Sequence, residues 1–161
     1  MLVTLVTAAL AIIGTLLGAI VSGRFQERAA ERAVRVGHTE TIRRDRLEAV
    51  TALAVAVSDH RRTLWKLGEA VLKGDDAALV QALRAESQAT RAAVARPLVT
   101  MRVLITDPAV REAADRMITL TYAIRESLDT AQALAAARQE AVAAHDEFVD
   151  TAARYLTAQI A

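Results

Sequence analysis

The chain begins with an uncharged run, and this run constrains the fold more than any other feature of the sequence. Residues 1–23 hold no Asp, Glu, Lys, Arg or His, and Arg24 ends the run. An apolar stretch of about 20 residues is long enough to cross the hydrocarbon core of a bilayer as one helix. Such a helix satisfies its own backbone hydrogen bonds in lipid. We therefore predict a transmembrane helix over residues 1–23.

The flanks of this run predict its orientation. A cleaved signal peptide is the alternative, but it would carry basic residues before a shorter apolar core. Here the basic residues follow the run, at Arg24, Arg28, Arg32 and Arg35. Loops rich in Lys and Arg stay in the cytoplasm. We expect a single-pass protein of the cell membrane, with its N-terminus outside and its C-terminal domain cytoplasmic; a spanin-like periplasmic rod would need the opposite orientation.

Small residues form a row along the predicted membrane helix. Gly14 and Gly18 have the GxxxG spacing, and Ser22 continues the same row. Small residues four apart let two helix backbones approach closely, which favours self-association in lipid. The alternative is that these residues are simply common in membrane helices. The row predicts a homo-oligomer formed through Gly14, Gly18 and Ser22.

Residues 24–43 are predicted to continue the membrane helix as a basic juxtamembrane stalk. No proline interrupts the segment, and charges of both signs interleave in it, as in the pair Glu31–Arg35. The excess of arginine either binds anionic lipid headgroups or serves only as a topology signal on a solvated helix face. We favour the second interpretation.

Residues 44–161 are predicted to form one helical bundle domain. The whole chain has no Cys, two Pro and only 3% aromatic residues, so its core must be aliphatic. Apolar residues recur at three- and four-residue steps, which is typical of amphipathic helices. The first stripe contains Val50, Leu53, Val57, Leu64, Leu67 and Val71, with His60 in the missing step. Four stripes predict an antiparallel four-helix bundle.

Turn residues predict where these helices begin and end. Gly74 and the two aspartates after it predict a sharp turn, and Asp107-Pro108 predicts a helix start. Pro97 predicts a kink or an end of the second helix, with residues 101–106 as an extended connector. Residues 127–130 are the predicted turn between the last two helices. The alternative is three long helices, the last running from Pro108 to the end.

The sequence contains no motif that names a reaction. His60 and His145 both fall on predicted core stripes and could meet to bind a metal, but the Glu-x-x-His spacing of paired-helix metal sites is missing. We predict no catalytic residue, no metal and no cofactor, and therefore no enzyme. The net charge of +1 gives no electrostatic case for a nucleic-acid partner. The expected partners are the lipid bilayer, copies of the chain and a protein whose identity the sequence does not give.

Three stretches carry a resemblance to known proteins: the anchor end at Gly23-Arg24, the segment RRDRLEAVTALA and the segment DPAVREAADRM. With them the chain resembles a loose class of small, uncharacterised single-pass membrane proteins of high-GC Gram-positive bacteria. The resemblance implies an Ala- and Arg-rich cytoplasmic helical bundle behind the membrane helix. It implies no activity.

These features predict a membrane-anchored, non-enzymatic interaction or assembly protein. The cytoplasmic bundle would serve as adaptor or assembly module. The alternative is a structural or pore-associated membrane component of a mobile element or phage that acts by helix oligomerisation. A pore lined by this helix alone is disfavoured, because its only polar side chains are four Thr and Ser hydroxyls.

Overall fold

The computed structural model describes residues 40–158 of the chain. The chain divides into two compact units, Met1–Ile42 and Arg43–Ala161. The predicted membrane helix (residues 1–23) and nearly all of the predicted stalk (residues 24–43) lie outside the described residues. Within residues 40–158, no helix is both long and apolar enough to cross a membrane.

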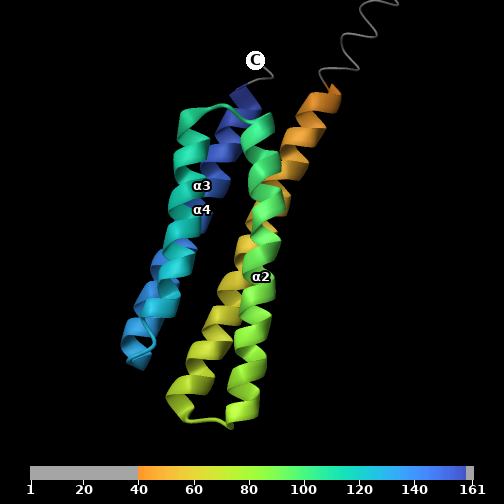
Figure 1. Ribbon diagram of the computed structural model, residues 1–161. Coiled ribbons are helices and arrows are strands. Elements are labelled where there is room, and N and C mark those ends of the chain that lie inside the picture. Colours follow the sequence, from red (N-terminus) through yellow and green to blue (C-terminus); the bar gives the residue numbers. More distant parts are fainter. Residues whose placement is uncertain (1–39, 159–161) are drawn as a thin grey trace, which may run out of the picture. The chain divides into compact units, whose positions relative to one another are not determined.

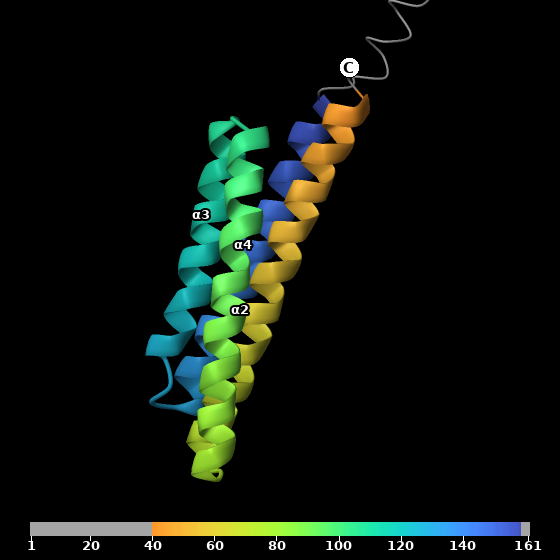
Figure 2. The ribbon, with the colours of Figure 1, turned by 45° about the vertical axis from the view of Figure 1, so that its right-hand side comes forward.

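The described residues form an all-helical bundle. The first helix covers residues 40–73, and it is followed by α2 (Ala77–Leu104), α3 (Pro108–Ala123), the short 3-10 helix η1 (Ile124–Glu126) and α4 (Ala131–Ala158). Successive helices run in opposite directions, from the first helix in orange and yellow to α4 in blue (Figure 1). The view turned by 45° shows the same side-by-side arrangement (Figure 2). The prediction of an antiparallel helical bundle is confirmed.

The turns between the helices follow the predicted residues. Gly74 ends the first helix with a φ of +69°, a conformation that favours glycine because it has no Cβ. Asp107 caps α3, because its carboxylate accepts a hydrogen bond of 3.0 Å from the amide of Val110. Thr130 precedes α4, and its hydroxyl accepts a hydrogen bond of 3.1 Å from the amide of Ala133. The alternative of one long helix from Pro108 onward is wrong, because residues 127–130 are not helical.

Two details of the predicted helix ends differ in the structure. Asp76 occupies the N-cap position of α2, but its carboxylate makes no capping hydrogen bond. Pro97 neither ends α2 nor starts a connector, since the helix continues for seven more residues to Leu104. One missing amide donor is outweighed here by burial, because Val94 before the proline and Met101 after it are both in the core. Only residues 105–107 separate α2 from α3.

The core consists of aliphatic side chains with one phenylalanine, and it forms two clusters. The larger cluster includes Leu53, Val94, Met117 and Phe148, one from each helix, all essentially inaccessible to solvent. The second cluster is smaller. It holds Leu64, Ile124, Leu134 and Ala141, near the turn between α3 and α4. The stripe predicted for the first helix is confirmed as its buried face from Val50 to Leu67, and only its last member, Val71, is partly exposed.

Candidate functional site

A run of six polar residues follows the mostly apolar segment 49–57 of the first helix, about halfway along its length. We call Ser58, Asp59, His60, Arg61, Arg62 and Thr63 the polar band. The band separates two hollows of the bundle surface. His60 lines a cavity beside α2, whereas Ser58, Asp59 and Arg62 line a groove beside α4. Polar groups at a concave surface are the part of a helical bundle best suited to binding.

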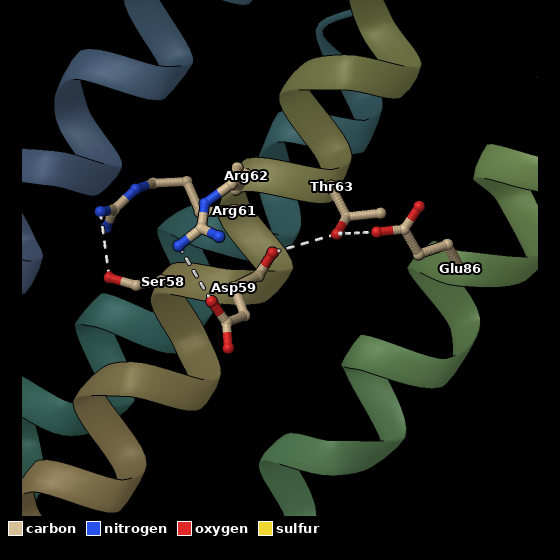
Figure 3. Close-up of polar contacts among 6 residues, drawn as sticks. All are labelled: Ser58, Asp59, Arg61, Arg62, Thr63 and Glu86. Atoms are coloured by element: carbon tan, nitrogen blue, oxygen red, sulfur yellow. Dashed lines mark hydrogen bonds and ion pairs between the residues drawn. The ribbon is translucent and has the colours of Figure 1, made fainter.

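Two hydrogen bonds join the polar band to α2. His60 Nδ1 lies 2.9 Å from the hydroxyl of Thr90. Thr63 donates its hydroxyl proton toward the carbonyl of Asp59 at 3.1 Å or toward the carboxylate of Glu86 at 3.4 Å, and Figure 3 shows the second contact crossing between the helices. These bonds fix the rotation of the first helix against α2.

The other side of the band is held by short-range contacts (Figure 3). Arg61 donates to the hydroxyl of Ser58 at 3.2 Å, and Arg62 forms an ion pair with Asp59 at 3.0 Å. The Nη1 atom of Arg61 is buried and has no hydrogen-bond partner. Burial, and next the charge of Arg138 on α4, lower the pKa of Arg61. A guanidinium nevertheless keeps its positive charge inside proteins.

His60 is buried and electrically neutral. Only 2% of its surface is exposed, and its ring meets the ring of Tyr122 edge-on at 5.4 Å. Burial, and next the charge of Arg91, lower its pKa from 6.5 to about 4. The Thr90 hydroxyl lies 3.1 Å from two backbone carbonyls to which it can donate, so its oxygen accepts a hydrogen bond from Nδ1–H of the neutral ring. His60 therefore has a structural partner at neutral pH.

The groove runs between the first helix and α4 and is mainly apolar. Its volume is about 460 Å³. Leu47 and Val55 at its edge are each 53% exposed, and Val149 of α4 is 38% exposed. The remaining lining residues are Val50, Thr51, Ala54, Ser58, Asp59, Arg62, His145, Ala153 and Leu156. An exposed aliphatic strip of this kind on a bundle is typical of a surface that receives another helix.

The cavity on the opposite side of the polar band has a different character. It lies between the first helix, α2 and the segment after α3, and its volume is about 330 Å³. Aliphatic side chains line it together with His60 and Tyr122, and three arginines complete it, namely Arg84, Arg91 and Arg125. The guanidinium carbon of Arg91 lies 4.6 Å from the ring centroid of Tyr122. This cavity was missed in the sequence analysis, because each of these arginines, taken alone, is typical of a solvent-exposed helix face.

The site residues predicted from the sequence fall largely outside this region. Gly14, Gly18 and Ser22, and the juxtamembrane arginines, lie outside the described residues. His60 and His145 do not form a common site, because they line different hollows. His145 instead contacts the carboxylate of its neighbour Asp146 at 3.2 Å. In residues 40–158, no three His, Cys, Asp or Glu side chains come together to hold a metal ion.

The chain is similar to known proteins of one family. Residues 47–156 match the model of a family described as KilB plasmid transfer protein. Protein KilB of Streptomyces lividans is 39% identical over 150 residues, which cover 93% of this chain and 97% of the relative. No solved structure matches the chain. The family match covers almost the whole described bundle, and with it the groove, the polar band and the cavity.

Proposed function

We propose, from the premise that the chain belongs to the KilB plasmid transfer protein family, that it is a membrane-anchored, non-enzymatic component of plasmid transfer. Its helical bundle would serve as an assembly module at the cytoplasmic face of the membrane. The name of the family supports a role in a mobile element. Such a role was the alternative hypothesis of the sequence analysis. The absence of a reaction motif in the sequence supports a non-enzymatic role.

The membrane anchor in this proposal rests on the sequence. Residues 1–23 have the length and apolar character of a membrane span. The alignment with the Streptomyces lividans relative leaves only 11 residues of this chain outside it, so it reaches into residues 1–23. The apolar run therefore belongs at least in part to the region that the two proteins share.

The observation that carries the assembly role is the apolar groove between the first helix and α4. We assign it to a second copy of this chain. Its two charged lining residues, Asp59 and Arg62, form an ion pair with each other, so two copies can meet here without net repulsion. The exposed ridge of Leu47 and Val55 lies beside the groove, and a two-fold axis would place the ridge of each copy in the groove of the other. Such self-complementary pairing is the commonest symmetry of homo-oligomers.

Disulfide crosslinking tests this assignment, because the natural sequence contains no cysteine. Val55→Cys places one thiol at the edge of the groove, and the full-length protein is oxidised mildly in membranes. We expect a rapid crosslink to a dimer, since Val55 lines the groove that would receive Val55 of the other copy, which brings the two thiols near each other. Val103→Cys on α2 is the matched control: this valine is 72% exposed and does not line the groove.

The crosslinking rates of the two variants distinguish assembly through the groove from assembly through the membrane segments and from binding of another protein. Faster crosslinking of Val55→Cys than of Val103→Cys supports assembly through the groove. Equal rates would show that the membrane segments alone hold copies together without a bundle interface. A protein that stays monomeric with either thiol would contradict self-assembly. It would favour an adaptor role, in which the groove receives a helix of another protein.

A further inference from the structure

The cavity beside α2 is lined by three arginines, and a carboxylate near it, that of Glu126, lines an adjoining hollow with Arg91 and Arg125. Arg84 and Arg91 are seven residues apart on α2, so they project from the same face of the helix, and Arg125 reaches the cavity from η1. None of the residues that line the cavity is Asp or Glu. Within residues 40–158, none of these three arginines forms an ion pair. All three arginines are exposed to solvent, which screens their mutual repulsion, and an anion bound among them would be attracted by all three.

The rest of the lining restricts the kind of anion. Leu64, Leu67 and Val71 of the first helix and Leu128 after η1 form an apolar wall below the arginines. The neutral ring of His60 adds no positive charge, and its hydrogen bond to Thr90 holds it in place. A volume of about 330 Å³ is at the small end of the range for ligand sites. The cavity thus matches a molecule with a charged head and a compact apolar body.

We propose that this cavity binds a small organic phosphate, with the phosphate held by Arg84, Arg91 and Arg125 and an apolar body packed on Leu64, Leu67, Val71 and Leu128. Guanidinium groups suit this head because they donate paired hydrogen bonds to phosphate oxygens. Arg91 is already oriented, since its guanidinium rests over the ring of Tyr122. The same chemistry occurs in soluble phosphate monoesters and in lipid headgroups. This site is separate from the groove assigned to self-assembly and does not depend on it.

Isothermal titration calorimetry on the full-length protein in neutral detergent tests the proposal. The probes are phenyl phosphate, inorganic phosphate and phenol. Phenyl phosphate carries both the phosphate and the apolar ring, whereas inorganic phosphate lacks the ring and phenol lacks the phosphate. We expect saturable binding of one phenyl phosphate per chain, and weaker binding of inorganic phosphate and of phenol. Dihexanoyl phosphatidic acid below its micellar concentration is the fourth probe. If this lipid binds more tightly than phenyl phosphate, the natural ligand is a lipid headgroup. If it binds more weakly, the natural ligand is a soluble phosphate ester.

Arginine variants show whether the heat comes from this cavity. Arg84→Gln and Arg91→Gln are each expected to weaken phenyl phosphate binding at least about tenfold, the usual loss for a charge-assisted hydrogen bond at a binding site. Arg96→Gln, on the same helix but outside the cavity, should bind like the natural protein. Circular dichroism confirms that each variant remains folded. No saturable binding, equal binding by all variants, or equal affinity for inorganic phosphate would overturn the proposal.

Discussion

The buried His60 makes the stability of the bundle depend on pH in a way that one substitution can isolate. Its pKa is about 4 in the folded protein and 6.5 in the unfolded chain. Between these values the unfolded state binds the proton and the folded state does not, so folding stability falls as the pH falls. Above pH 6.5 the contribution is fully present, and below about pH 4 there is no further loss. Since one pKa unit corresponds to 1.36 kcal/mol, His60 accounts for a loss of about 3 kcal/mol between pH 7 and pH 4.

Urea unfolding of a fragment starting at Thr41 measures this loss. The fragment should be soluble and strongly helical by circular dichroism, because its apolar residues lie on stripes that the bundle buries. His60→Gln removes the titrating ring but keeps a side-chain amide that can donate to Thr90. The variant should therefore lose about 3 kcal/mol less than the natural fragment on going from pH 7 to pH 4.

The two proteins share all their carboxylates, so acid titration of those groups cancels in the comparison. His145→Gln serves as the matched control, because it removes a half-buried histidine and leaves His60 in place. The loss assigned to His60 should remain in this variant, because the His60 ring is unchanged. If the natural fragment and His60→Gln lose equal amounts of unfolding free energy between pH 7 and pH 4, His60 is not held neutral by burial. A fragment that is unfolded at pH 7 would contradict the helical bundle itself.

Three further variants test separate parts of the chain. Thr121 is fully buried and its hydroxyl has no hydrogen-bond partner, so Thr121→Val should raise the free energy of unfolding by about 1 kcal/mol in urea titrations; a lower value would mean that the hydroxyl is bonded. Gly74→Ala should lower that free energy by about 1 kcal/mol, because alanine is strained at a φ of +69°, and an unchanged urea midpoint would refute this reason. Replacing Gly14 and Gly18 together with Ile should leave membrane insertion intact and reduce chemical crosslinking in membranes, since branched side chains separate the helices. Equal crosslinking would show that these glycines play no part in assembly.

Local rules predicted most of the fold, since the turns of this chain depend on local residues. Gly74, Asp107 and Thr130 each act within a few residues of their own position, and the structure places a helix boundary at each of them. Pro97 shows where local rules fail. Its effect on α2 is decided by the burial of Val94 and Met101 against the other helices, which a local rule does not include.

The two hollows could not be predicted, because they depend on how helices distant in sequence pack together. Arg125 and Arg91 are 34 positions apart, and only the packing of η1 beside α2 brings them to one cavity. One sign was nevertheless present in the sequence. The six polar residues from Ser58 to Thr63 follow a mostly apolar segment, and such a run indicates that some polar side chains of the helix are buried and need hydrogen-bond partners.

Whether the bundle is held at the cytoplasmic face of the membrane is tested most directly by a reporter fused after Ala161. Two fusions are compared in living cells, one to a fluorescent protein that matures only in the cytoplasm and one to an enzyme active only outside it. With residues 1–23 spanning the membrane and the arginines after them inside, we predict fluorescence that sediments with the membranes and no activity of the external enzyme. Strong activity of the external enzyme, or fluorescence that stays in the soluble fraction, would contradict a cytoplasmic bundle anchored at the membrane.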